Sequence, residues 1–186
     1  MEWSFGIVLR QPLTREQADA FDHCDALADG AISYTLAPDD SEVHPLSADS
    51  ALLRELACDI EAPTLLDAVA QAVQRVRHID GLQAVGVTLP DTVTLDEAAQ
   101  RSGTGARSLA QLSQDEGFPK PESESGEGTV LYAWDRVAAF LRNMGEPVPE
   151  VPQDLVIADL TLRLVNALDG SDVSPGALRA LGLPID

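Results

Sequence analysis

Apolar and polar positions along the first 30 residues follow two periods in succession. Residues 3–9 alternate with a period of two, which predicts a strand with one buried face. Thr14 and Gln17 then form a capping-box pattern, which predicts that a helix begins there. This helix, expected to end near Asp29, should bury five residues on one face: Ala20, Phe21, Cys24, Leu27 and Ala28.

The next 60 residues contain the remaining elements of a first domain, separated by turn clusters rich in Pro, Asp and Gly. The expected elements are a strand at 32–36, a Pro-containing edge strand at 42–46, a short helix at 51–60, a helix at 65–78 that begins after Thr64, and a strand at 82–89. Counting the longer elements and the edge strand, the order is strand, helix, strand, strand, helix, strand. This order predicts a ferredoxin-like βαββαβ domain over 1–90, with a packing, dimerisation or ligand-sensing role.

A second, smaller unit is expected over 91–146, after a boundary at Pro90. Its expected elements are a helix that begins after Thr94, a turn at 102–105, a second helix at 106–114, a strand at 129–134 and a third helix that begins at Asp135. The first helix starts with another capping box, and glycines in the turn supply conformations that other residues resist. Two short helices around a tight turn are typical of a helix-turn-helix.

The remaining residues, 147–186, are expected to form a proline-rich linker and a C-terminal helix. Proline-rich segments are extended and semi-rigid. A helix over 154–168 would carry an apolar stripe, and a short helix is expected over 175–181. The stripe consists of Ile157, Leu160, Leu164 and Leu168. An apolar stripe of this length needs a partner, either within the chain or in a second copy.

Four pieces of sequence follow one another between residues 92 and 143: TLDEAAQRSG, ARSLAQL, GFPKP and VLYAWDRVAAFL. In this order they resemble the excisionase/MerR-like winged helix-turn-helix family. The most specific part is the aliphatic and aromatic strand that runs into WDRVAAFL after the GFPKP segment. The first 145 residues are also similar to bacterial, actinobacterial-type two-domain proteins. We therefore expect an α+β fold, with a ferredoxin-like domain, a winged helix-turn-helix and a C-terminal helical tail.

The resemblance implies that the second helix enters the major groove of double-stranded DNA and that the loop between strands contacts neighbouring phosphates. Carried over by position, the DNA-binding residues would be Thr104, Arg107, Ser108, Gln111, Gln114, Lys120 and Ser123. Arg can read guanine, and Gln can read adenine, through paired hydrogen bonds. The expected function is sequence-specific DNA binding and transcriptional regulation by a homodimer.

Charge leaves an alternative open, because the chain has 31 acidic and 12 basic residues and a formal charge of −19, which opposes DNA at long range. Residues 91–146 hold ten acidic and five basic residues, and Glu122, Glu124 and Glu127 fall on the expected wing. DNA binding requires that these acids leave a neutral or basic strip with Arg101 and Lys120. Otherwise the module fits an acidic adaptor (antitoxin-like, phage-related or a DNA mimic) that binds a basic protein.

Other chemistry finds little support in the sequence. The histidines and cysteines lack the spacing of zinc ligands, and no nucleophile motif is recognisable, so we expect neither an enzyme, a metal nor a cofactor. Arg75, Arg77 and His78 either complement the end of a helix or contact an anionic ligand. No apolar run approaches the roughly 18 residues that span a bilayer, and the N-terminus lacks a secretion signal, which favours the cytoplasm.

Overall fold

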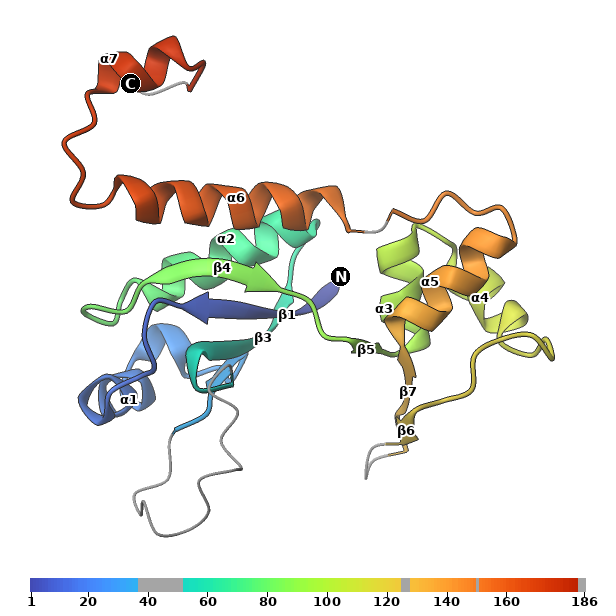
Figure 1. The fold of residues 1–186 in the computed structure, drawn as a ribbon. Coiled ribbons are helices and arrows are strands. Elements are labelled where there is room, and N and C mark those ends of the chain that lie inside the picture. The colour runs from blue at the N-terminus through green and yellow to red at the C-terminus, as the bar shows by residue number, and fades with distance from the viewer. Residues whose placement is uncertain (37–51, 125–127, 150, 184–186) are drawn as a thin grey trace, which may run out of the picture.

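The computed structural model describes residues 1–36, 52–124, 128–149 and 151–183 of the chain. The fold is mixed α+β with antiparallel sheets, which confirms the expected class (Figure 1). The strands are β1 Glu2–Leu9, β2 Ile32–Tyr34, β3 Glu55–Glu61, β4 Ala84–Thr88, β5 Thr92–Val93, β6 Ser123–Glu124 and β7 Val130–Ala133. The α-helices are α1 Arg15–Asp22, α2 Leu65–Val76, α3 Leu95–Ser102, α4 Ala106–Leu112, α5 Trp134–Asn143, α6 Gln153–Leu168 and α7 Pro175–Ala180.

The first four strands form one sheet in the order β2-β3-β1-β4, and every neighbouring pair is antiparallel. Alternation along β1 buries Phe5, Ile7 and Leu9 on one face, as the period of two predicts. Phe21 of α1 and Val69 of α2 belong to the same core cluster as these residues. Both helices therefore pack on the same face of the sheet.

β3 corrects the expectation of a helix over 51–60. A 3₁₀ turn at Leu52–Arg54 leads directly into this strand, which pairs with both β1 and β2. Leu56, Cys58 and Ile60 are buried in alternation, so pairing on both sides overrides a spacing of leucines that also suits a helix. The edge strand expected at 42–46 lies outside the described residues.

α1 is shorter than expected, although its start is confirmed. The backbone N–H of Gln17 donates to Thr14 Oγ1 at 3.2 Å, and the N–H of Thr14 donates to Gln17 Oε1 at 3.1 Å. The helix ends at Asp22, and a 3₁₀ turn at Asp25–Leu27 returns Leu27 to the core. The expected stripe is wrong in part. Within α1, Ala18 is buried and Ala20 is exposed; after α1, where the turn breaks the helical period, Cys24 is half-buried and Ala28 is exposed.

The second unit has its own core and runs in the order β5, α3, α4, β6, β7, α5, with a sheet order of β5-β7-β6. Val93, Leu109, Val137 and Leu141 are fully buried in this second cluster. Val148 also belongs to it, so the first part of the proline-rich segment packs on this unit. The two clusters share no residue, because the chain leaves the first sheet after β4 and starts the second at β5.

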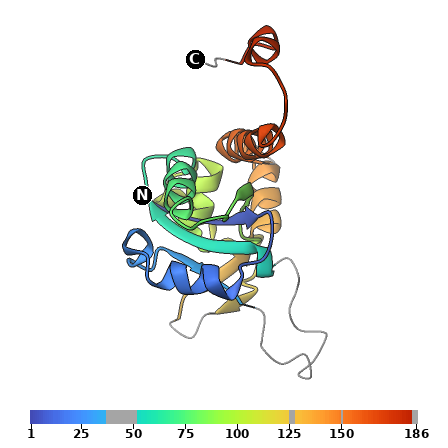
Figure 2. The ribbon, with the colours of Figure 1, turned by 90° about the vertical axis from the view of Figure 1, so that its left-hand side faces the viewer.

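α6 returns to the first unit and lies along the edge strand β4 (Figure 1). Ala158 and Leu162 enter the first core, and the N–H of Val87 in β4 donates to Asp159 Oδ1 at 3.3 Å. A helix in this position covers an edge that could otherwise pair with another chain. α7 stands apart beyond α6 in both views (Figure 2). Within the described ranges, no helix combines the length and apolar character that crossing a bilayer requires.

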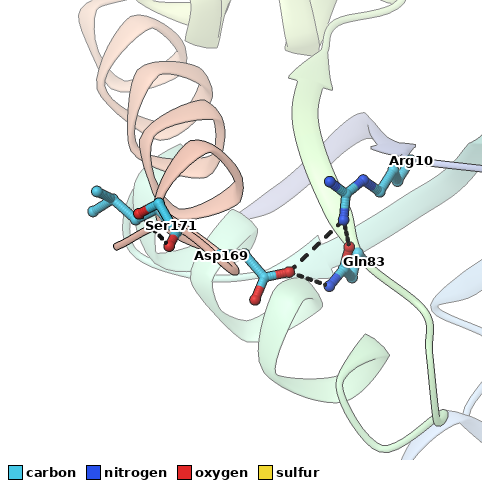
Figure 3. A network of polar contacts seen from close by, with 5 residues as sticks. Arg10, Gln83, Asp169 and Ser171 are labelled. Atoms are coloured by element: carbon cyan, nitrogen blue, oxygen red, sulfur yellow. Dashed lines mark hydrogen bonds and ion pairs between the residues drawn. The ribbon is translucent and has the colours of Figure 1, made fainter. Parts of the chain in front are cut away.

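A polar network fixes the C-terminal end of α6 on the sheet (Figure 3). Gln83 Nε2 donates to Asp169 Oδ2 at 2.9 Å, and Arg10 Nη1 donates to Gln83 Oε1 at 2.7 Å. Arg10 Nη1 also lies 3.7 Å from Asp169 Oδ2. This network joins the end of β1, the start of β4 and the residue after α6.

Of the apolar stripe expected on α6, only Leu168 is half-buried, and the other three residues do not pack on the first unit. Ile157, Leu160 and Leu164 are 42%, 60% and 37% exposed, whereas Ala158 and Leu162 are buried. Both faces of this helix are apolar, so the pattern alone could not distinguish the inner face from the outer one.

Candidate nucleic-acid interface

α4 is held to the second unit by one side of the helix and exposes the other. Leu109 is fully buried in the core, and Leu112 is half-buried against it. Arg107, Ser108 and Gln111 are exposed. With one buried position per turn, a helix of this length presents a polar face to solvent.

α3 sets the direction of α4 through a short turn. The N–H of Glu97 donates to Thr94 Oγ1 at 3.2 Å and the N–H of Thr94 to Glu97 Oε2 at 2.7 Å, which confirms the second capping box. Gly103 ends α3 with φ of +72°, a left-handed conformation that glycine adopts without strain. Gly105 is the N-cap of α4 and has an ordinary negative φ of −63°.

The other expected contact residues lie on separate segments. Gln114 follows α4 and is exposed, and its N–H donates to the carbonyl of Gln111. Lys120 is exposed between α4 and β6, and Ser123 is exposed within β6, where it pairs with Leu131 of β7. β6 and β7 pair antiparallel with each other and are the next strands in the chain after α4.

Thr104 is placed differently from the other six residues. Its Oγ1 is buried and has no hydrogen-bond partner, so this hydroxyl does not reach solvent. Its N–H donates to Ser102 Oγ at 3.2 Å and is not free to bind a phosphate. Thr104 therefore supports the turn and offers neither group to a ligand in this conformation.

Arg101 cannot contribute to the neutral or basic strip that was the condition for DNA binding, so such a strip would have to rest on Arg107 and Lys120. Arg101 is only 7% exposed, and its Nη1 donates to the carbonyl of Pro90 at 2.8 Å. Its guanidinium carbon lies 5.6 Å from the centre of the Trp134 ring, within the range of a cation–π contact. Burial lowers the pKa of Arg101 from its usual value. Arg101 thus ties α3 to the junction between the two units.

The sequence did contain a signal for this burial. Arg101 lies three positions after Ala98 on α3, and residues three apart share a face of a helix. Ala98 is fully buried, so Arg101 belongs to the inward face.

Exposed acids follow the candidate interface in the chain. Asp115 and Glu116 are exposed shortly after α4, Glu122 is exposed just before β6, and Glu124 is exposed within β6. Glu122 Oε1 lies 3.9 Å from Arg136 Nη2, which compensates part of its charge. Glu127 lies outside the described residues.

Two bases remain available on this surface. Arg107 is the only charged residue of α4, and among the described residues neither Arg107 nor Lys120 has an ion-pair partner. The exposed face of α4 therefore carries positive charge and hydrogen-bonding groups, whereas the exposed acids lie on the segment that follows this helix in the chain. Comparisons with protein-family models, curated proteins and solved structures gave no match to this chain.

Proposed function

We propose that this chain is a sequence-specific DNA-binding transcriptional regulator that reads the major groove with α4. The observation that carries the proposal is the exposed face of Arg107, Ser108 and Gln111 on a helix anchored by Leu109. Arg and Gln can each form paired hydrogen bonds with a base edge, and Ser can donate to a phosphate or a base.

The order of elements in the second unit supports a winged helix-turn-helix. A strand, two helices joined by a glycine turn, a two-stranded hairpin and a third helix follow one another. In this arrangement α3 and α5 support α4, and the β6–β7 hairpin acts as the wing that contacts the adjacent backbone. Lys120 and Ser123 precede or lie within that hairpin.

For the first unit we favour a ferredoxin-like domain. The strand order β2-β3-β1-β4, with antiparallel neighbours and two helices on one face, is the arrangement that this name describes. It would serve as the packing partner of α6 and as a platform for pairing or ligand sensing.

Acting as a homodimer would compensate for the low DNA affinity of a single module, because two modules double the number of phosphate contacts. One module offers few bases for phosphate contacts, which supply much of the affinity for DNA. Four residues form an outer stripe on α6, each between 37% and 60% exposed: Val156, Ile157, Leu160 and Leu164. None of them is charged, and a self-complementary apolar patch is suited to a two-fold symmetric pair.

The proposal is tested by DNA binding across a range of salt concentrations. A random-sequence duplex should bind at about 50 mM salt and weaken as salt rises, with a slope that counts the phosphates contacted. After selection of a preferred site from a random pool, Arg107→Ala should weaken specific binding by about 1–3 kcal/mol. Arg54→Ala is the matched control, because it removes the same charge from an exposed position on the first unit.

The second candidate is an acidic adaptor for a basic protein. It is favoured by the exposed acids Asp115, Glu116, Glu122 and Glu124, which follow α4 in the chain. Absence of DNA binding at about 50 mM salt would reject the DNA-binding proposal in favour of the adaptor. Equal effects of Arg107→Ala and Arg54→Ala would also reject α4 as the reading helix.

A further inference from the structure

A cavity of about 490 Å³ lies in the first unit, between the end of α2, the start of β4 and the C-terminal half of α6. Its size falls within the range of small-molecule sites, which are mainly apolar with a few polar groups. Val73 and Val76 of α2 form one side of the wall, and Leu162, Val165 and Leu168 of α6 form the other. An apolar body placed there would contact both helices at once.

One polar atom in this wall lacks a partner. Asn166 lines the cavity, and its Oδ1 is buried without a hydrogen bond. A buried carbonyl-type oxygen normally has a donor, because leaving it unpaired costs about 1–3 kcal/mol. This oxygen has no accessible surface as it stands, so a rotation of the Asn166 side chain toward the cavity is needed to bring the acceptor to a ligand N–H or O–H.

The charged groups of the cavity favour an anion over a cation. Arg77 lines the cavity, is exposed, and has no ion-pair partner within the described part of the chain. Its neighbour Arg75 is already bound to Asp29 at 2.7 Å. Asp169 also lines the cavity, but its carboxylate accepts from Gln83 and lies near Arg10 (Figure 3). The unpaired charge is therefore positive.

We propose that this cavity binds a small amphipathic carboxylate that carries an N–H or O–H donor. The apolar part would lie between α2 and α6, the carboxylate would pair with Arg77, and the donor would bind Asn166 Oδ1. The three features together select against purely apolar ligands and against amines. Because the site lies entirely in the first unit and α6, this inference does not depend on DNA binding.

The full chain can be tested by calorimetric titration with four probes of similar size. N-acetyl-leucine has the carboxylate, the N–H donor and the apolar chain. Its methyl ester lacks the charge, 4-methylpentanoate lacks the N–H donor, and leucinamide carries the opposite charge. We expect saturable binding of N-acetyl-leucine and binding about tenfold weaker for each of the other three.

Variants assign the binding to the cavity. Arg77→Gln should reduce the affinity for N-acetyl-leucine about tenfold and leave the methyl ester unchanged, because only the charged contact is lost. Asn166→Leu should remove the preference for N-acetyl-leucine over 4-methylpentanoate. Arg54→Gln, an exposed arginine on the same unit that does not line the cavity, is the matched control.

Several outcomes would overturn the inference. These are no saturable binding of N-acetyl-leucine at about 10 mM, equal binding of leucinamide, or equal effects of Arg77→Gln and Arg54→Gln. Arg77 is exposed at the end of α2, so its substitution is not expected to prevent folding, and far-UV circular dichroism checks this. Failure of these titrations would leave the salt-dependent DNA binding of α4 unaffected, so the two proposals fail separately.

Discussion

α4 and α6 both expose one face, yet the two faces differ in chemistry. α4 exposes polar side chains around a single base, Arg107, and is held by one fully buried leucine. α6 is held by Ala158, Leu162 and a polar network at its end, and it exposes an uncharged aliphatic stripe. A polar face can exchange contacts with a ligand for contacts with water at a small cost in free energy. Exposing a covered aliphatic stripe to water costs much more free energy. This difference supports the proposal that α4 serves reversible recognition and α6 lasting association.

The largest effect is expected when the anchor of α4 is removed. Leu109→Ala should lower the free energy of unfolding of the second unit by about 2–5 kcal/mol, because Leu109 is fully buried and its loss leaves a cavity. Urea denaturation measures this change. Leu160→Ala on α6, at a position 60% exposed, is the contrasting control and should change monomer stability by less than about 0.5 kcal/mol. Similar losses for the two variants would contradict the distinction between anchor and surface.

The second prediction concerns Arg101, which fixes α3, the helix that contacts α4, to the junction between the two units. Arg101→Met should lower the free energy of unfolding by about 2 kcal/mol, since it removes a charged hydrogen bond and leaves the carbonyl of Pro90 unpaired. Thermal unfolding of the full chain measures the effect. A loss of DNA affinity at Arg101 without any loss of stability would instead place this residue at the interface, against its burial.

The outer stripe of α6 predicts an effect on association and little effect on folding. Leu160→Asp should raise the dissociation constant of the proposed homodimer by about tenfold or more, which corresponds to about 1.4 kcal/mol. Analytical ultracentrifugation across micromolar concentrations measures it. Ala110→Asp on α4 is the matched control, because Ala110 is exposed on the other helix. A wild-type chain that remains monomeric at these concentrations would remove α6 as a pairing surface.

The smallest effect is expected at the turn that orients α4. Gly103→Ala should lower the free energy of unfolding by about 1 kcal/mol, because Gly103 has a positive φ that an alanine resists. No atom lies within 4 Å of the added Cβ, so the cost comes from the backbone alone. Gly117→Ala, at a glycine of the same unit that has no positive φ and where the added Cβ makes only an ordinary van der Waals contact, is the control and should leave stability unchanged or slightly raise it. Equal destabilisation by both variants would contradict this account of the turn.

Several elements were predictable from sequence because their signals are local. The two capping boxes, at Thr14 and Thr94, form hydrogen bonds within three residues, and both are present. Alternation along β1 predicted its buried face in the same way. β3 was missed because the apolar residues of this segment fit both a helical period and a period of two, and only its pairing with β1 and β2 decided between them.

For the candidate sites, prediction depended on how far apart the contributing residues lie. The exposure of Arg107, Ser108 and Gln111 follows from their spacing around Leu109 within a single helix. The spacing from Ala98 predicts that Arg101 faces inward, but its contacts with Pro90 and Trp134 come from other segments, and the 490 Å³ cavity needs α2, β4 and α6 together. No pattern within one element contains that information.

The sequence by itself determined where the helices with capping boxes begin, where a glycine ends α3, and which residues of α4 share an outward face. Those features depend on hydrogen bonds and side-chain spacing within a few residues. Only the tertiary structure decided which apolar face of α6 covers the edge of β4, where Arg101 lies and where the cavity opens. These outcomes arise from contacts between segments far apart in the chain, where burial of apolar area and pairing of buried polar groups select one arrangement.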